Sequence, residues 1–147
     1  MTSFSVPRTT VTPQQLLSEQ VRRILAAPVY DLAIETPLQA APALSAALGN
    51  QVLLKREDLQ PTFSFKIRGA YTRLSRLTDV QRERGVITAS AGNHAQGVAL
   101  AASHLGIKAT IVMPTTTPSL KVEGVRSRGG HVAVSYTHLT LPTTPYV

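Results

Sequence analysis

Residues 85–114 read "GVITASAGNHAQGVALAASHLGIKATIVMP", and this stretch decides the fold class. Two short apolar segments, 85–90 and 108–114, flank a segment whose apolar residues recur at helical spacing until Gly106. A strand, a helix and a second strand in this order predict a βαβ unit, whose two strands lie parallel in one sheet. The stretch therefore indicates an α/β protein.

The same alternation continues on both sides. A helix is expected to open at Lys66, and another is expected between Thr117–Pro118 and Gly129–Gly130. "HVAV" (131–134) then predicts a further strand. Upstream, the sequence predicts a helix that begins with a capping box from Thr12 to Gln15. Its apolar stripe consists of Leu17, Val21, Ile24 and Leu25. A short helix over 43–48 and a strand in 51–57 are predicted to follow.

Composition narrows the class of protein. The chain has 147 residues, a formal charge of +7 and no cysteine, which excludes disulfides and thiolate metal sites. It has no apolar run long enough for a membrane span and no secretory signal at its start, so a cytoplasmic protein is expected. The basic residues lie in scattered pairs beside acidic ones, which favours a solvated surface over a nucleic-acid interface. No metal site and no nucleic-acid partner are expected.

Lys66 stands in an unusual setting, "TFSFKIRGAY" (62–71). Phe65 and Ile67 are expected to desolvate its amine, and both a helix start and nearby Arg68 disfavour its positive charge. A lysine held neutral in this way is a nucleophile for carbonyl groups. The alternative is a lysine whose stem lies on apolar surface and whose ammonium stays in water, and spacing alone favours that alternative.

A glycine-rich turn, "TASAGNHAQGVA" (88–99), follows a strand and opens a helix. Backbone N–H groups at such a position form an anion site. Gly92 and Gly97 do not fit the dinucleotide fingerprint, and the lysine that would follow Gly97 in a nucleotide-binding P-loop is absent. The turn suits a carboxylate as well as a phosphate. Alternatively, Ser90 caps the helix while Asn93 and His94 are ordinary loop residues.

"SFKIRGAY" (64–71) and "ITASAGNHAQGVA" (87–99), in this order and separation, resemble biosynthetic threonine dehydratases (threonine ammonia-lyases). The resemblance runs over about residues 20–134 and includes "IVMPTTTPSLKVEGVRSRGG" (111–130). These enzymes belong to the tryptophan-synthase-β-like class, fold type II, of pyridoxal-phosphate enzymes. The resemblance implies the N-terminal part of that fold, with a parallel sheet of βαβ units that is incomplete.

The resemblance also implies roles for individual residues. Lys66 would bind pyridoxal 5'-phosphate covalently and remove the substrate's Cα proton. Asn93 would hydrogen-bond the ring oxygen of the cofactor, and Phe65 would pack beside the cofactor. The substrate's carboxylate would be held by the loop of Ser90, Ala91, Gly92, Asn93 and His94.

The implied reaction converts L-threonine to 2-oxobutanoate and ammonia, the first step of isoleucine biosynthesis. Related serine racemases have a proton-carrying serine at the position of Ala91, so alanine favours elimination over racemisation. The alternatives are a sister enzyme of the same fold (catabolic serine/threonine dehydratase, serine racemase or cysteine synthase) and, from another class, a basic nucleic-acid-binding module or an inert fragment.

Three regions are expected. Residues 1–30 form an N-terminal helical arm, and residues 31–134 form part of a catalytic domain. Residues 135–147 form a non-native tail, since they carry no charged side chain and resemble a translated sequencing adapter. The 147-residue chain itself is expected to be a truncated, inactive fragment of a longer enzyme. That parent enzyme is expected to be a homo-oligomer that acts on threonine, or on serine, and to have no membrane partner.

Overall fold

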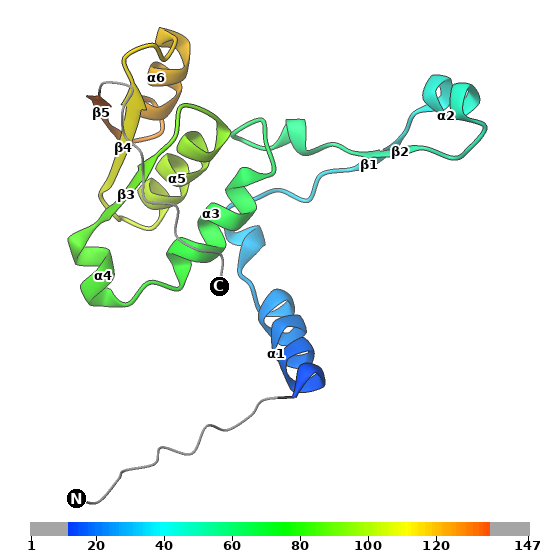
Figure 1. Ribbon diagram of the computed structural model, residues 1–147, viewed down its shortest axis with the longest axis horizontal. Coiled ribbons are helices and arrows are strands. Elements are labelled where there is room, and N and C mark those ends of the chain that lie inside the picture. The colour runs from blue at the N-terminus through cyan, green and yellow to red at the C-terminus, as the bar shows by residue number, and fades with distance from the viewer. Residues whose placement is uncertain (1–11, 136–147) are drawn as a thin grey trace, which may run out of the picture.

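The computed structural model describes residues 12–135 (Figure 1). Its main sheet has three parallel strands in the order β3-β4-β5, and each pair of neighbouring strands is joined by a helix. The predicted βαβ units and the α/β fold class are therefore confirmed. The elements are β3 (Val86–Ala89), α5 (Asn93–His104), β4 (Ala109–Pro114), α6 (Ser119–Arg126) and β5 (His131–Ser135).

The core lies between this sheet and its helices. Helix α5 is positioned between the strands and α3 (Lys66–Ser75), and α6 packs against α5 and β5 (Figure 1). Buried Ile111 and Met113 of β4 face this layer. On the edge strands, Ile87 is 74% exposed and Val134 is 55% exposed. Exposed apolar side chains on a parallel sheet are unusual, because such sheets are normally covered on both faces.

An arm that is distinct from the predicted N-terminal helical arm projects from this body (Figure 1). It consists of β1 (Leu38–Ala40), α2 (Pro42–Leu48) and β2 (Leu53–Lys55), and its two strands pair antiparallel. The predicted strand in 51–57 and the predicted short helix are confirmed. Strand β1 was not predicted, because it lies in a segment punctuated by prolines, which are poor strand residues.

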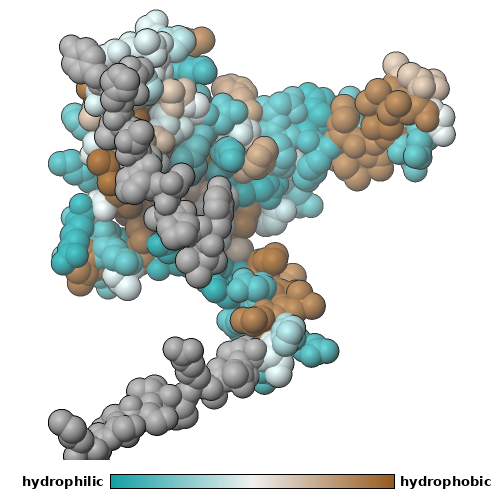
Figure 2. All heavy atoms as spheres, in the orientation of Figure 1, coloured by the Kyte–Doolittle hydropathy of each residue, from teal (hydrophilic) through white to brown (hydrophobic). Residues whose placement is uncertain are grey.

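Helix α1 (Pro13–Leu25) begins with the predicted capping box, in which Thr12 and Gln15 bond each other's backbone N–H groups. None of its residues is buried: Leu17, Val21 and Ile24 are 66%, 45% and 70% exposed. The predicted apolar stripe is present, and within residues 12–135 it remains uncovered. Figure 2 shows brown residues along α1 and at the tip of the arm.

Other elements differ from expectation. Helix α6 confirms the helix expected between Thr117–Pro118 and Gly129–Gly130, but Pro118 is its N-cap and Thr117 makes no capping hydrogen bond. Helix α4 (Asp79–Arg84) was not predicted, although Thr78 and Gln81 form a second capping box. Two short 3₁₀ turns, Val29–Asp31 and Glu57–Leu59, complete the described elements.

Across the described part of the chain, none of the helices combines the length and apolarity that crossing a membrane requires. The division into three regions stays a prediction. Most of the expected tail lies outside the described residues, and only Ser135 is included, as the last residue of β5.

Candidate active site

Lys66 is the first residue of α3, as predicted. It is exposed, and so is Phe65, while Ile67 is fully buried. The Lys66 Nζ lies 5.2 Å from the centroid of the Phe65 ring. Such a contact attracts an ammonium group electrostatically and leaves it in water. The expectation that both flanking side chains desolvate Lys66 was therefore wrong: Ile67 turns into the core, and Phe65 offers its ring to the amine.

Arg68 does not oppose Lys66 as expected, because its charge is neutralised by a carboxylate. Its Nε and one terminal nitrogen each donate to Glu57, at 2.8 Å. The paired guanidinium lowers the pKa of Glu57 to about 2, and a hydrogen bond of 2.6 Å from Thr36 adds to the effect. This bidentate pair ties the start of α3 to the turn at Glu57–Leu59.

The loop before Lys66 is held by groups that sequence reasoning missed. Gln60 is 1% exposed, and its side chain accepts from the N–H of Ile34 and donates to the carbonyl of the same residue. Arg128 donates to the carbonyl of Pro61 at 3.0 Å. Phe63 has a φ of 54°, a left-handed conformation that is uncommon for an aromatic residue. No pattern in the sequence marks these long-range contacts.

The glycine-rich turn joins β3 to α5, as predicted. Gly92 is the N-cap of α5 in an extended conformation, and its N–H donates to the hydroxyl of Ser90 at 3.3 Å. The alternative in which Ser90 caps the helix is therefore wrong. The first N–H groups of a helix have no acceptor within that helix, so those at Asn93 and His94 point toward the space beyond the strand and can bind an anion.

Gly97 brings this turn close to Lys66. A Cβ atom at position 97 would lie 3.3 Å from the carbonyl carbon and oxygen of Lys66 and 3.3 Å from the nitrogen of Ile67. This distance is tighter than nearly all ordinary Cβ contacts, and the nearest atoms are backbone atoms that cannot rotate away. Glycine therefore lets the first turn of α3 and the second turn of α5 approach this closely without displacing either backbone.

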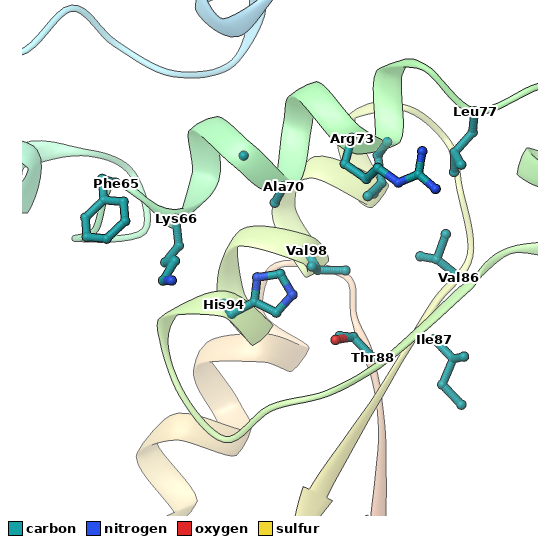
Figure 3. A pocket seen from close by; sticks show the side chains of 12 residues that line it. Phe65, Lys66, Ala70, Arg73, Leu77, Val86, Ile87, Thr88, His94 and Val98 are labelled. Atoms are coloured by element: carbon teal, nitrogen blue, oxygen red, sulfur yellow. The ribbon is translucent and has the colours of Figure 1, made fainter. Parts of the chain in front are cut away.

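A cleft of about 510 Å³ opens beside these two helices. Figure 3 shows the Lys66 side chain extending from the start of α3 toward the first turn of α5, where His94 lies. Phe65, Lys66 and His94 are the predicted site residues that line the cleft, whereas Ser90, Ala91, Gly92 and Asn93 do not. The remaining walls are largely apolar, with Ala70, Leu74 and Val98 from the core, and Arg73 is a lining residue that sequence reasoning missed.

His94 and Lys66 interact electrostatically across this cleft. The pKa of His94 is lowered, first because burial disfavours the imidazolium and second because the positive charge of Lys66 repels it. A neutral imidazole beside an amine can accept a proton or a hydrogen bond. The cleft therefore combines a primary amine, a neutral base and a helix start that favours anions.

These features fit pyridoxal phosphate. The cofactor needs an accessible amine for its aldehyde and apolar walls for its ring, and the cleft supplies both through Lys66 and its apolar lining. The helix start at α5 suits a carboxylate of an amino-acid substrate. Among residues 12–135 no cluster of three potential metal ligands is found.

The chain belongs to the family of pyridoxal-phosphate dependent enzymes, whose family model matches residues 29–141. It is 56% identical over 115 residues to the biosynthetic L-threonine dehydratase of Pasteurella multocida, and this match covers 78% of the chain and 22% of the relative. It is 59% identical over 116 residues to the chloroplastic biosynthetic threonine dehydratase 1 of Solanum lycopersicum, covering 79% of the chain and 19% of the relative. The chain thus spans about a fifth of the length of these curated relatives.

Solved structures agree with this placement. The processed form of threonine deaminase isoform 2 from Solanum lycopersicum superposes with a TM-score of 0.82 at 51% identity, covering 91% of the chain and 39% of that structure. Maize serine racemase superposes with a TM-score of 0.77 at 38% identity, covering 82% of the chain and 36% of that structure. The predicted fold type and the predicted resemblance to threonine dehydratases are therefore confirmed.

Proposed function

We propose that this chain belongs to a pyridoxal-phosphate dependent threonine dehydratase that converts L-threonine to 2-oxobutanoate and ammonia. The observation that carries the proposal is the position of Lys66. Its amine lies in a cleft of about 510 Å³, at the start of α3. Helix α3 is in backbone contact with α5, the helix that follows the glycine-rich turn. The 56–59% identity to two biosynthetic threonine dehydratases supports threonine as the substrate.

Each residue has a proposed part in the reaction. When bound, pyridoxal phosphate supplies an electron sink for the pair left at the substrate's Cα. Lys66 would hold the cofactor through its Nζ, and the same nitrogen would accept the Cα proton of the substrate. Phe65 would pack beside the cofactor, and Asn93 would donate to its ring oxygen.

The turn orients the substrate. The N–H groups at the start of α5, with Ser90, Ala91, Gly92, Asn93 and His94 around them, hold the threonine carboxylate. The β-hydroxyl leaves as water, and a second water molecule releases ammonia, so the overall products are 2-oxobutanoate and ammonia. Because the methyl group of Ala91 has no ionisable proton, the turn offers no second acid or base there, which favours elimination over racemisation.

The test combines covalent trapping with product analysis. In the longest form that the gene encodes, added pyridoxal phosphate should produce a near-visible absorbance band, and borohydride reduction should lock the cofactor onto the peptide that contains Lys66. Lys66→Ala should remove both signals and the formation of 2-oxobutanoate. Lys108→Ala, which removes an exposed lysine outside the cleft, should retain them. Cofactor trapped on another lysine, or conversion of L-serine to D-serine with no 2-oxobutanoate formed from L-threonine, would contradict the proposal.

Three further proposals concern assembly, location and partners. We infer a homo-oligomeric parent and a cytoplasmic location from the family resemblance, although the Solanum lycopersicum relative is chloroplastic by name. We also infer that nucleic acid is no partner. Size-exclusion chromatography tests the oligomeric state, and cell fractionation tests the location. An oligonucleotide-binding assay at low salt tests whether nucleic acid is a partner.

A further inference from the structure

A second groove lies between α1 and α3, on the other side of Arg73 from the Lys66 cleft. Its volume is about 460 Å³, and ten residues line it. We call it the arginine groove, since Arg23, Arg68, Arg73 and Arg76 are among those residues. No acidic residue lines it. Basic residues that are scattered along the sequence therefore gather at one place in the fold.

The geometry of α3 explains this gathering. Arg68, Thr72 and Arg76 recur every four residues, and Gly69 and Arg73 form the adjacent row, so all five lie on the face of α3 that lines the groove. Arg23 approaches from α1, and its carbonyl accepts a hydrogen bond of 2.7 Å from Arg76. That bond fixes the guanidinium of Arg76 beside Arg23 without neutralising either charge.

Only one of the four charges is compensated within the described part of the chain. Arg68 pairs with Glu57, whereas Arg23, Arg73 and Arg76 form no salt bridge among residues 12–135. Positive charges that line one groove repel one another, and an anion bound among them would relieve that repulsion. Their planar donor sets match carboxylate groups in two-point contacts, which is how arginine clusters recognise acidic segments.

The other wall of the groove is apolar. Ile24, Ala27 and Val29 line it, and Ile24 continues the exposed stripe that Leu17 and Val21 begin on α1. A small inorganic anion would leave this stripe in water. An amphipathic acidic polypeptide would cover the stripe with its apolar face and meet the arginines with its carboxylates.

We propose that the arginine groove docks an acidic, amphipathic polypeptide segment. The charge complementarity comes from three uncompensated guanidinium groups, and the apolar complementarity comes from the stripe on α1. This surface is separate from the Lys66 cleft except at Gly69 and Arg73, which line both spaces.

The test uses the 147-residue chain and a fluorescent helical peptide with leucine on one face and glutamate on the other. Binding should be measured by anisotropy at several salt concentrations. Arg23→Gln with Arg76→Gln should weaken binding by about tenfold at low salt, and the difference should shrink as salt screens the charges. Ile24→Glu should weaken binding as well. A peptide with lysine in place of glutamate should not bind.

The matched control is Arg22→Gln with Arg84→Gln, which removes the same charge from arginines that do not line the groove. It should change the affinity by less than about twofold. Circular dichroism checks that every variant is folded, and Arg23→Gln alone is the fallback because no hydrogen bond from the Arg23 side chain is found among residues 12–135. Equal loss in the control pair, or binding of a duplex oligonucleotide but not of the acidic peptide, would overturn the proposal.

Discussion

Gly97 in α5 and Lys66 at the start of α3 are in backbone contact, so close that a methyl group at position 97 would have to displace backbone atoms by a few tenths of an ångström. This contact fixes the distance between α3, which carries Lys66, and α5, which follows the glycine-rich turn. Because the contacting atoms belong to the backbone, the spacing does not depend on side-chain rotamers. The separation of the two halves of the site is therefore a property of the packing of α3 on α5.

Gly97→Ala should separate these helices. We expect a loss of about 1–3 kcal/mol in the free energy of unfolding, because the added methyl forces backbone displacement in a packed layer. Urea denaturation provides the measurement. Gly69→Ala is the matched control: it also lies in a helix, but a Cβ there meets nothing within 4 Å. It should leave stability unchanged or raise it by up to about 1 kcal/mol, through helix propensity. Equal destabilisation in both variants would contradict the close-approach explanation.

Acid should remove the contribution of the Glu57–Arg68 pair. The pKa of Glu57 falls from 4.5 to about 2 in the folded state, mainly because Arg68 donates to its carboxylate. As the pH falls, the unfolded state binds this proton first, so the stabilisation is complete above about pH 4.5 and is lost as the pH approaches about 2. Urea midpoints across this range should fall in the parent chain and fall less steeply in Glu57→Gln. Glu83→Gln, at an exposed glutamate outside the described salt bridges, should keep the parent slope.

The imidazole of His94 should report on the charge of Lys66. Burial and the Lys66 ammonium both lower the pKa of His94. Lys66→Met should therefore raise that pKa, while the burial contribution keeps it below the usual histidine value. Proton NMR titration of the ring signals measures it. Lys108→Met is the control, because the Lys108 carbonyl pairs with Val86, at the opposite end of β3 from the turn. A shift of the same size in the control would show that the coupling is not local.

Gln60 should be far more important for stability than an exposed glutamine. Gln60→Leu would leave both the N–H and the carbonyl of Ile34 without their present partner, and we expect a loss of about 2 kcal/mol or more. Gln51→Leu, at an exposed position, should change stability by less than about 0.5 kcal/mol. Urea denaturation of the two variants makes the comparison, and similar losses in both would contradict the buried bridge.

Local sequence signals predicted the βαβ layer because each signal acts within its own segment. The glycine-rich turn before α5 and the apolar segment that forms β4 depend on neighbours only a few residues away, as does the capping box of α1 at Thr12. The Lys66 environment was predicted less well. Phe65 and Ile67 are adjacent in sequence, yet one side chain is exposed and the other is buried, because a helix start turns successive residues in different directions.

Contacts between distant segments gave no local signal. The bond from Arg128 to Pro61 spans 67 residues, and the bridge from Gln60 to Ile34 spans 26. Neither segment has a periodicity or motif that requires its partner. The arginine groove has the same origin: its residues come from two helices more than 40 positions apart, so the pairs seen in the sequence indicated only a solvated surface.

The packing of α5 limits which amino-acid substitutions this chain can accept. Its buried positions are alanine, glycine and one valine, enclosed by α3, α6 and the sheet, so nearly every substitution there would add volume to a space that has none. At its N-terminus, Asn93 and His94 lie outside the packed core, with the His94 ring partly desolvated by the cleft, and they meet no such limit. A scan of all substitutions that is scored by the amount of folded protein should therefore find few tolerated changes at the buried positions of α5 and many at positions 93 and 94. New substrate preferences would have to arise through changes at positions 93 and 94, while the buried positions of α5 stay constant.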